Sequence, residues 1–348
     1  MARQSLILMS ILATVCSLAT GPVAAQTPAA ATKPNGTPTK AYVQPKTPDG
    51  QPDISGYWTN ATYVPLERPK GVTKEFYTPE EMAKIERDAA LRESEQTVPG
   101  TPRDVHYSGA QFGIERSQAT FASNLRTGLI VDPPDGRIPP QIPEAAKRNA
   151  AIAAARTRSD LGMSHLDLPL TARCLVTTAD GPPHIGYNDL SNYQFIQSPG
   201  YVTILVERGR TVRIIPLDGR PFPSSNVRSW FGTSRGHWEG NTLVVETRNS
   251  NGRVQASAQL QIKGGSEDMR IIERFTRVSP DRIDYRFTVD DPKTWARSFT
   301  AEGPFERLEP QGPIFEYACH EGNYGMLNIL RGARAQEKAA ELRKKGSN

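Results

Sequence analysis

Alternation of apolar and polar residues is the clearest pattern in the second half of the chain. Within residues 282–289, Ile283, Tyr285, Phe287 and Val289 fall on one face, and charged or hydroxyl side chains fall on the other. This period of two is typical of an antiparallel strand that is buried on one face. Similar runs separated by turn residues predict further strands at residues 168–178, 193–197, 201–207, 211–216, 234–247, 255–263, 269–278 and 295–308.

The run at residues 234–247 predicts a hairpin at the centre of this meander. Its two halves are joined by Glu239, Gly240 and Asn241, and both Gly and Asn tolerate the positive φ that tight hairpin turns need. The second half is β-branched and apolar, which favours a sheet. We expect this hairpin to form a ligand-facing wall.

Eight or nine successive strands would leave two unpaired edges in an open sheet, and closure into a barrel removes both. The sequence therefore predicts a mainly β fold, in which an antiparallel meander at residues 168–325 closes into a lipocalin-like barrel. An N-terminal extension at residues 47–167 is expected to pack two helices on the barrel. A C-terminal helix is expected at residues 326–348.

Helix signals support this division. Thr78, Pro79 and Glu81 have the spacing of an N-cap, a first helical residue and a capping-box partner, which predicts a helix through about residue 94. Residues 143–158 are rich in Ala and predict a second helix. The short run at residues 54–60 is expected to form an edge strand or a plug.

The N-terminus has the pattern of a secretory signal. Residues 1–25 combine Arg3, a short apolar core and an A-x-A-like site before Gln26, whereas a membrane anchor is the alternative. Residues 26–46 have little to bury and predict a disordered linker. We therefore expect a periplasmic or secreted protein, with no membrane span after removal of the signal.

The charge balance and the absence of known sequence motifs disfavour several classes of function. The 348 residues include 42 Lys and Arg against 37 Asp and Glu, and no basic block is interleaved with aromatic residues, which disfavours a nucleic-acid partner. The sequence has no P-loop, dinucleotide-binding, nucleophile-elbow or HExxH motif. We predict no cofactor and no metal site, and the sequence does not define the oligomeric state.

Cys174 and Cys319 are the two cysteines outside the expected signal, and an even pair in an exported chain predicts a disulfide. Two free buried thiols are the alternative. A Cys/His metal site is less favoured because the usual ligand spacing is absent.

The first candidate site lies in the central hairpin and contains Arg235, His237, Trp238 and Glu239. In a strand, His237 and Glu239 point to the same face, and the imidazole titrates near neutral pH, so it can move a proton. Arg235 would stabilise negative charge, and Trp238 would contact substrate. The alternative is a histidine that bonds only to backbone.

The second candidate site follows the last expected strand and contains Tyr317, His320, Glu321 and Tyr324. Polar segments that contain Gly at the mouth of a barrel often build small-molecule sites. The alternative is a structural segment in which Glu321 or Asn323 caps the C-terminal helix.

Three further residues are candidates for substrate binding if the disulfide forms. Asn192 and Tyr193 begin the meander, and Arg173 adjoins Cys174, so the disulfide would bring them toward His320. Arg173 would then pair with an anionic group, although a salt bridge within the protein is the alternative.

Four segments together resemble a family of uncharacterised exported proteins from environmental Gram-negative bacteria. They are PDGQPDISGYW at residues 48–58, IPLDGR at 215–220, GHWEGNTLVVET at 236–247 and EYACHEGNYG at 316–325. The resemblance covers nearly the whole mature chain. It implies export and one shared architecture, and it implies nothing about a substrate. A looser similarity, of topology alone, is to lipocalin-like barrels.

Two functional hypotheses follow. The first is an exported enzyme that performs cofactor-independent acid–base chemistry (elimination, isomerisation or hydrolysis) on a small, partly apolar organic molecule. His237 and His320 would move protons, Glu239 or Glu321 would orient them, and Tyr324 would stabilise charge. The second is a non-catalytic periplasmic carrier of such a molecule. A purely structural protein with a filled barrel is the third alternative.

Overall fold

The computed structural model describes residues 42–94, 124–158, 168–177, 180–186, 191–209, 211–253, 262–308 and 314–346, which belong to one compact unit spanning Tyr42–Asn348. The expected signal peptide, most of the linker and most of the strand expected at residues 255–263 lie outside these ranges. The described residues begin at Tyr42, within the segment that the sequence predicts to be a linker. This part of the segment contacts the rest of the described chain, because Asp53 N donates a hydrogen bond to Pro45 O over 2.8 Å.

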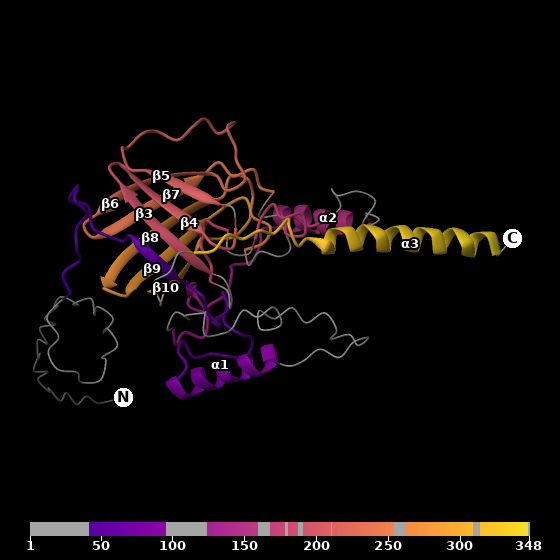
Figure 1. Cartoon of the computed structure of the whole chain (residues 1–348), viewed down its shortest axis with the longest axis horizontal. Helices are drawn as coiled ribbons and strands as arrows, with labels where there is room; N and C mark the ends of the chain where they lie inside the picture. Colours follow the sequence, from indigo (N-terminus) through magenta and orange to yellow (C-terminus); the bar gives the residue numbers. More distant parts are fainter. Residues whose placement is uncertain are drawn as a thin grey trace, which may run out of the picture. The chain divides into compact units, whose positions relative to one another are not determined.

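The described residues form a single antiparallel sheet that closes almost completely into a barrel (Figure 1), which confirms the predicted fold class. Nine strands follow the order β5-β4-β3-β1-β10-β9-β8-β7-β6, and β2 pairs with β10 outside this path. The strands are β1 (Gly56–Thr59), β2 (Ile130–Asp132), β3 (Asn192–Ser198), β4 (Tyr201–Val206), β5 (Val212–Pro216), β6 (Thr233–Glu239), β7 (Thr242–Arg248), β8 (Arg270–Ser279), β9 (Arg282–Asp290) and β10 (Phe299–Arg307).

Strand β1 joins the two halves of the meander, so the expectation of an edge strand or a plug is wrong. It pairs with β3 on one side and with β10 on the other. The reason is the side chain of Trp58, which is fully buried and contacts the guanidinium groups of Arg277 and Arg307, 5.5 and 4.8 Å from the ring centroid. Burial of this large ring fixes the strand in the centre of the sheet.

The barrel closes where the two end strands of the sheet, β5 and β6, meet. Every neighbouring pair along the nine-strand path is antiparallel, so β5 and β6 at its two ends run in the same direction. Among the described strands no ladder joins these two. Their inward side chains close the boundary instead: Arg213 Nε donates to Ser234 Oγ over 2.9 Å, and a Cβ added to Gly236 would lie 2.8 Å from Ile215 Cγ2. We call this boundary the seam.

Aromatic side chains fill the barrel interior. Phe195, Phe275 and Phe305 are fully buried, and the Tyr285 ring lies 4.8 Å from that of Phe275 and 5.3 Å from that of Phe305. The predicted alternation of β9 is confirmed, because Ile283, Tyr285, Phe287 and Val289 are all buried. Among the described residues, aromatic side chains therefore occupy much of the barrel interior.

The described ranges contain three helices in addition to the sheet: α1 (Pro79–Ser94), α2 (Pro143–Arg158) and α3 (Tyr324–Gly346). The capping box of α1 is confirmed, because Glu81 N donates to Thr78 Oγ1 over 3.2 Å and Thr78 N donates to Glu81 Oε2 over 2.8 Å. Among the described helices none is both long and apolar enough to cross a bilayer.

The strand expected at residues 168–178 is absent from the described part of that segment. Residues 168–177 instead form successive turns, and Cys174 has a φ of 54°. The predicted disulfide between Cys174 and Cys319 is confirmed, with the two Cα atoms 5.8 Å apart. A residue in the left-handed region does not fit a regular strand, which is the physical reason for the difference.

Candidate functional site

A pocket of about 400 Å³ opens over the seam. Its walls are residues 211–214, which lead into and begin β5, and residues 229–234, which lead into and begin β6, with Gly181 and Pro182 alongside. Small-molecule sites fall in this range of volume. We call it the seam pocket.

Strand β5 has an inverted alternation that builds one side of the seam pocket. Val212 and Ile214 are 54% and 59% exposed, whereas Arg213 between them is only 6% exposed. An arginine turns inward only when its charge and donors are satisfied. The strand is therefore oriented by Arg213, and two apolar side chains are left facing the pocket.

All five N–H donors of Arg213 are engaged. Nε donates to Ser234 Oγ over 2.9 Å. Nη1 donates to Glu273 Oε1 over 3.0 Å and to His184 Nε2 over 3.3 Å. Nη2 donates to Thr247 Oγ1 over 2.9 Å and to Glu273 Oε2. Because a guanidinium can only donate, His184 Nε2 is the acceptor, and its ring is neutral.

Glu273 is fully buried on β8, and it receives one more hydrogen bond. Tyr285 Oη donates to Glu273 Oε1 over 2.9 Å, and His184 N donates to Tyr285 Oη over 3.0 Å. Burial and the neighbouring Glu273 charge raise the pKa of Tyr285 well above its usual value, so the phenol stays protonated. The seam cluster (Arg213, Glu273, Tyr285, His184, Ser234 and Thr247) therefore pairs one positive with one negative charge.

The hydroxyl groups of Ser234 and Thr247 complete the seam cluster. Their oxygens lie 2.8 Å apart, and each accepts from Arg213. Only one hydroxyl can donate to the other. Ser234 also lines the seam pocket, so it is the member of the cluster that can present a donor to a bound molecule.

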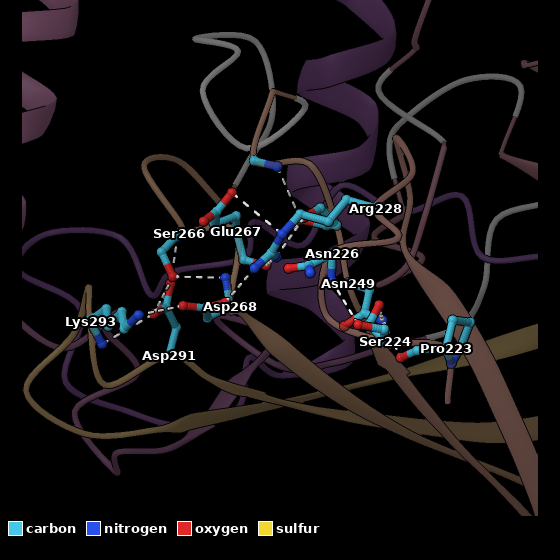
Figure 2. A network of polar contacts seen from close by, with 12 residues as sticks. Pro223, Ser224, Asn226, Arg228, Asn249, Ser266, Glu267, Asp268, Asp291 and Lys293 are labelled. Carbon is cyan, nitrogen blue, oxygen red and sulfur yellow. Dashed lines mark hydrogen bonds and ion pairs between the residues drawn. The ribbon is translucent and has the colours of Figure 1, made fainter. Parts of the chain in front are cut away.

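A polar network holds the segment that leads into the wall at residues 229–234 (Figure 2). Arg228 Nη2 donates to Asp268 Oδ1 over 2.8 Å, and Asn249 Nδ2 donates to Pro223 O over 3.1 Å. Asp268 also pairs with Lys293, and hydrogen bonds from Lys293 and Arg228 lower the pKa of Asp268. The wall is therefore tied to the loops that join β7 to β8 and β9 to β10.

Arg235, His237 and Glu239 of the first predicted cluster face away from the barrel interior, whereas Trp238 is half-buried and packs against the hydrophobic core. His237 and Glu239 share one face as expected, with His237 Nε2 3.2 Å from Glu239 Oε1, but their side chains are 62% and 49% exposed. Glu239 also pairs with Arg274 at 2.6 Å, and this bond and the one from His237 lower its pKa. Arg235 donates to the backbone oxygens of Arg220 and Pro221, and Trp238 Nε1 donates to Gln51 over 3.0 Å.

The second predicted cluster lies elsewhere. Tyr317 and Glu321 line an open groove of about 590 Å³ beside Glu207, whereas His320 is exposed and Tyr324 is 72% exposed at the start of α3. Asn323 Oδ1 accepts from Met326 N over 3.3 Å, as the helix-cap alternative expected. Among the described residues, His237 lines neither the seam pocket nor the groove that Tyr317 and Glu321 line, so neither joins the two predicted clusters.

The remaining predicted residues have separate environments. Asn192 Nδ2 donates to Glu207 Oε2 over 2.6 Å, and Phe315 N donates to Glu207 Oε1, so the start of the meander does approach the C-terminal segment. Tyr193 is fully buried against Phe305 in the core, and burial raises the pKa of its phenol. Arg173 is partly buried beside Cys174.

The sequence-based search missed the seam cluster, although a signal for it exists. In β8 the inward positions are Ile271, Glu273, Phe275 and Arg277, so charged residues interrupt an apolar face. A buried charge requires a partner, and that requirement points to Arg213, which occupies the equivalent position between the apolar residues of β5.

Within the described ranges no group of three or more His, Cys, Asp or Glu residues has the arrangement of a metal site. Comparisons with family models, with curated proteins and with solved structures find no match to this chain. The resemblance to a family of exported proteins therefore stays a prediction.

Proposed function

We propose that this protein binds a small, partly apolar organic molecule in the seam pocket, as an exported carrier or scavenger. The observation that carries the proposal is the exposure of Val212 and Ile214 at a pocket of about 400 Å³ that is also lined by Arg213 and Ser234 of the seam cluster. Apolar side chains that remain exposed beside a few fixed polar groups are typical of a ligand site.

The chemistry of the seam cluster favours binding over catalysis. Both Glu273 oxygens accept from Arg213, and Nε2 of His184 accepts from the same guanidinium. A general base needs a lone pair that can reach the substrate proton. Neither Glu273 nor His184 is a lining residue of the seam pocket, and the lone pair of His184 Nε2 is already used, so the arrangement holds a shape and presents little proton-transfer capacity.

A titration with Nile red, an uncharged apolar dye, tests the proposal. Ile214→Trp would fill the seam pocket, and Ile196→Trp, on β3, is the matched control because Ile196 is 43% exposed and is not a lining residue of that pocket. We expect the native protein and Ile196→Trp to bind the dye equally and Ile214→Trp to lose binding at least tenfold. Equal binding by all three would overturn the proposal.

A second candidate function is acid–base catalysis, with His237 and His320 as proton movers at two separate exposed positions. It is favoured by the pairing of His237 Nε2 with Glu239 Oε1 at 3.2 Å, the geometry by which a carboxylate orients an imidazole. Native mass spectrometry of the protein purified from its producing cells would identify a retained ligand. If the protein converts that ligand, the variant carrying both His237→Ala and His320→Ala should lose turnover; retained turnover would remove these residues from the mechanism.

Export to the periplasm or beyond is part of the proposal. The disulfide between Cys174 and Cys319 supports it, because such bonds persist in oxidising compartments. The mature chain should begin at Gln26. Intact-mass measurement of the protein from its producing cells tests this, and a chain that retains residues 1–25 would contradict it.

A further inference from the structure

The residues that line the seam pocket restrict the chemical class of ligand that it can bind. We infer that the pocket takes an uncharged molecule with a flat apolar ring and one hydrogen-bond acceptor, such as a carbonyl oxygen. This inference rests on the proposed function and deepens it.

Charge is the first constraint. Arg213 is the only ionisable side chain among the described residues that line the seam pocket, and its five donors are already engaged. An anion could bind the guanidinium only by displacing one of its present acceptors, and each of these belongs to a buried residue that would lose its hydrogen bond. A cation would face the guanidinium with no lining carboxylate to offset it. An uncharged ligand avoids both costs.

The apolar surface is the second constraint. Val212 and Ile214 face the seam pocket from β5, and Trp230 and Phe231 line it from the opposite wall. Aromatic side chains favour flat rings, which stack on them or meet them edge to face. This combination suits a ring held between aliphatic and aromatic walls.

A free hydroxyl hydrogen is the third constraint. Ser234 and Thr247 each accept from Arg213, and the single bond between them uses one of their two hydrogens. When Thr247 donates to Ser234, both lone pairs of Ser234 are occupied and its hydrogen remains available. Because Ser234 lines the pocket, this hydrogen would be available to an acceptor on the ligand.

Three naphthalene derivatives of matched size test the inference: 2-naphthamide, 2-naphthoate and 2-(aminomethyl)naphthalene, which are neutral, anionic and cationic at pH 7. Each would compete with Nile red on the full mature protein. We expect 2-naphthamide to displace the dye at a concentration at least tenfold lower than either charged compound. Displacement by 2-naphthoate or the amine at an equal or lower concentration would overturn the inference, and so would displacement by none of the three.

The role of Ser234 has its own control. Ser234→Ala should weaken 2-naphthamide about threefold to tenfold, the range of one hydrogen bond, and should leave 2-ethylnaphthalene, which has no acceptor, unchanged. Equal weakening of both compounds, or of neither, would contradict the role. If Nile red binding is insensitive to Ile214→Trp, the proposed function itself fails; if it is sensitive but the charge preference is absent, only this inference fails.

Discussion

Arg213 and Glu273 form a bidentate ion pair across the interior of the barrel, with Arg213 Nη1 3.0 Å from Glu273 Oε1 and Nη2 bonded to Oε2. The two residues are 6% and 0% exposed. This pair sets which way β5 faces, and so it determines both the closure of the seam and the apolar lining of the pocket above it.

Removal of one charge from this pair should be costly. Glu273→Gln keeps the shape of the side chain but leaves the Arg213 charge buried and uncompensated, so we expect a loss of about 3–5 kcal/mol in the free energy of unfolding by urea. Glu239→Gln is the control, because its pair with Arg274 is exposed and screened by solvent, so its loss should lower the stability far less. Similar losses in the two variants would contradict the account. The double variant Arg213→Met with Glu273→Leu should recover most of the lost stability.

The pocket wall depends on Gly232. Its φ is 76°, and an added Cβ would lie 2.4 Å from Arg248 O, so Gly232→Ala combines backbone strain with a clash. Gly200 has a similar φ of 78° but an added Cβ there meets nothing within 4 Å, which makes Gly200→Ala a matched control. We expect Gly200→Ala to cost about 1–2 kcal/mol and Gly232→Ala to cost about 1–3 kcal/mol more. Equal thermal midpoints for the two variants would show that the wall does not approach β7 as described.

The disulfide links residues 145 positions apart. Chain entropy predicts that the double variant Cys174→Ser with Cys319→Ser loses roughly 5 kcal/mol of unfolding free energy. The fully reduced native protein should show the same urea midpoint as this variant. If reduction leaves the native midpoint unchanged, the cross-link does not constrain the unfolded chain.

Asp180 gives a pH dependence with a defined sign. It is buried beside the seam pocket, where its carboxylate accepts from Thr177 N over 2.7 Å and from Thr211, a lining residue, and burial raises its pKa. A carboxyl with a raised folded-state pKa contributes stability below its unfolded pKa and loses that contribution as pH rises through the folded value. Asp180→Asn removes the titration. In urea unfolding, the free energy of unfolding of the variant relative to that of the native protein should therefore be higher at pH 7.5 than at pH 4. The opposite ordering would contradict the assignment.

The sequence predicted the barrel well because period-two alternation and short turns are local signals. The strand at residues 282–289 and the α1 capping box depend on neighbours a few positions away, and both are confirmed. The central position of β1 could not be predicted, since it depends on the packing of Trp58 against Arg277 and Arg307, more than 200 positions later in the chain.

The candidate site was harder to predict, for a physical reason. His237 and His320 attract notice because imidazole titrates near neutral pH, but residue type does not specify which face of a strand is buried. Arg213 and Glu273 look like surface residues by composition alone. Their structural role depends on their ion pair across the barrel, and the two residues are 60 positions apart in the sequence.

The most direct measurement is a map of backbone amide chemical shifts by NMR during titration with 2-naphthamide. The account predicts that the perturbed amides cluster at residues 211–214 and 229–234, which are the two walls of the seam pocket. Perturbations centred on the groove at residues 205–209 and 314–321, or spread without a centre, would contradict the claim that this protein binds its ligand at the seam.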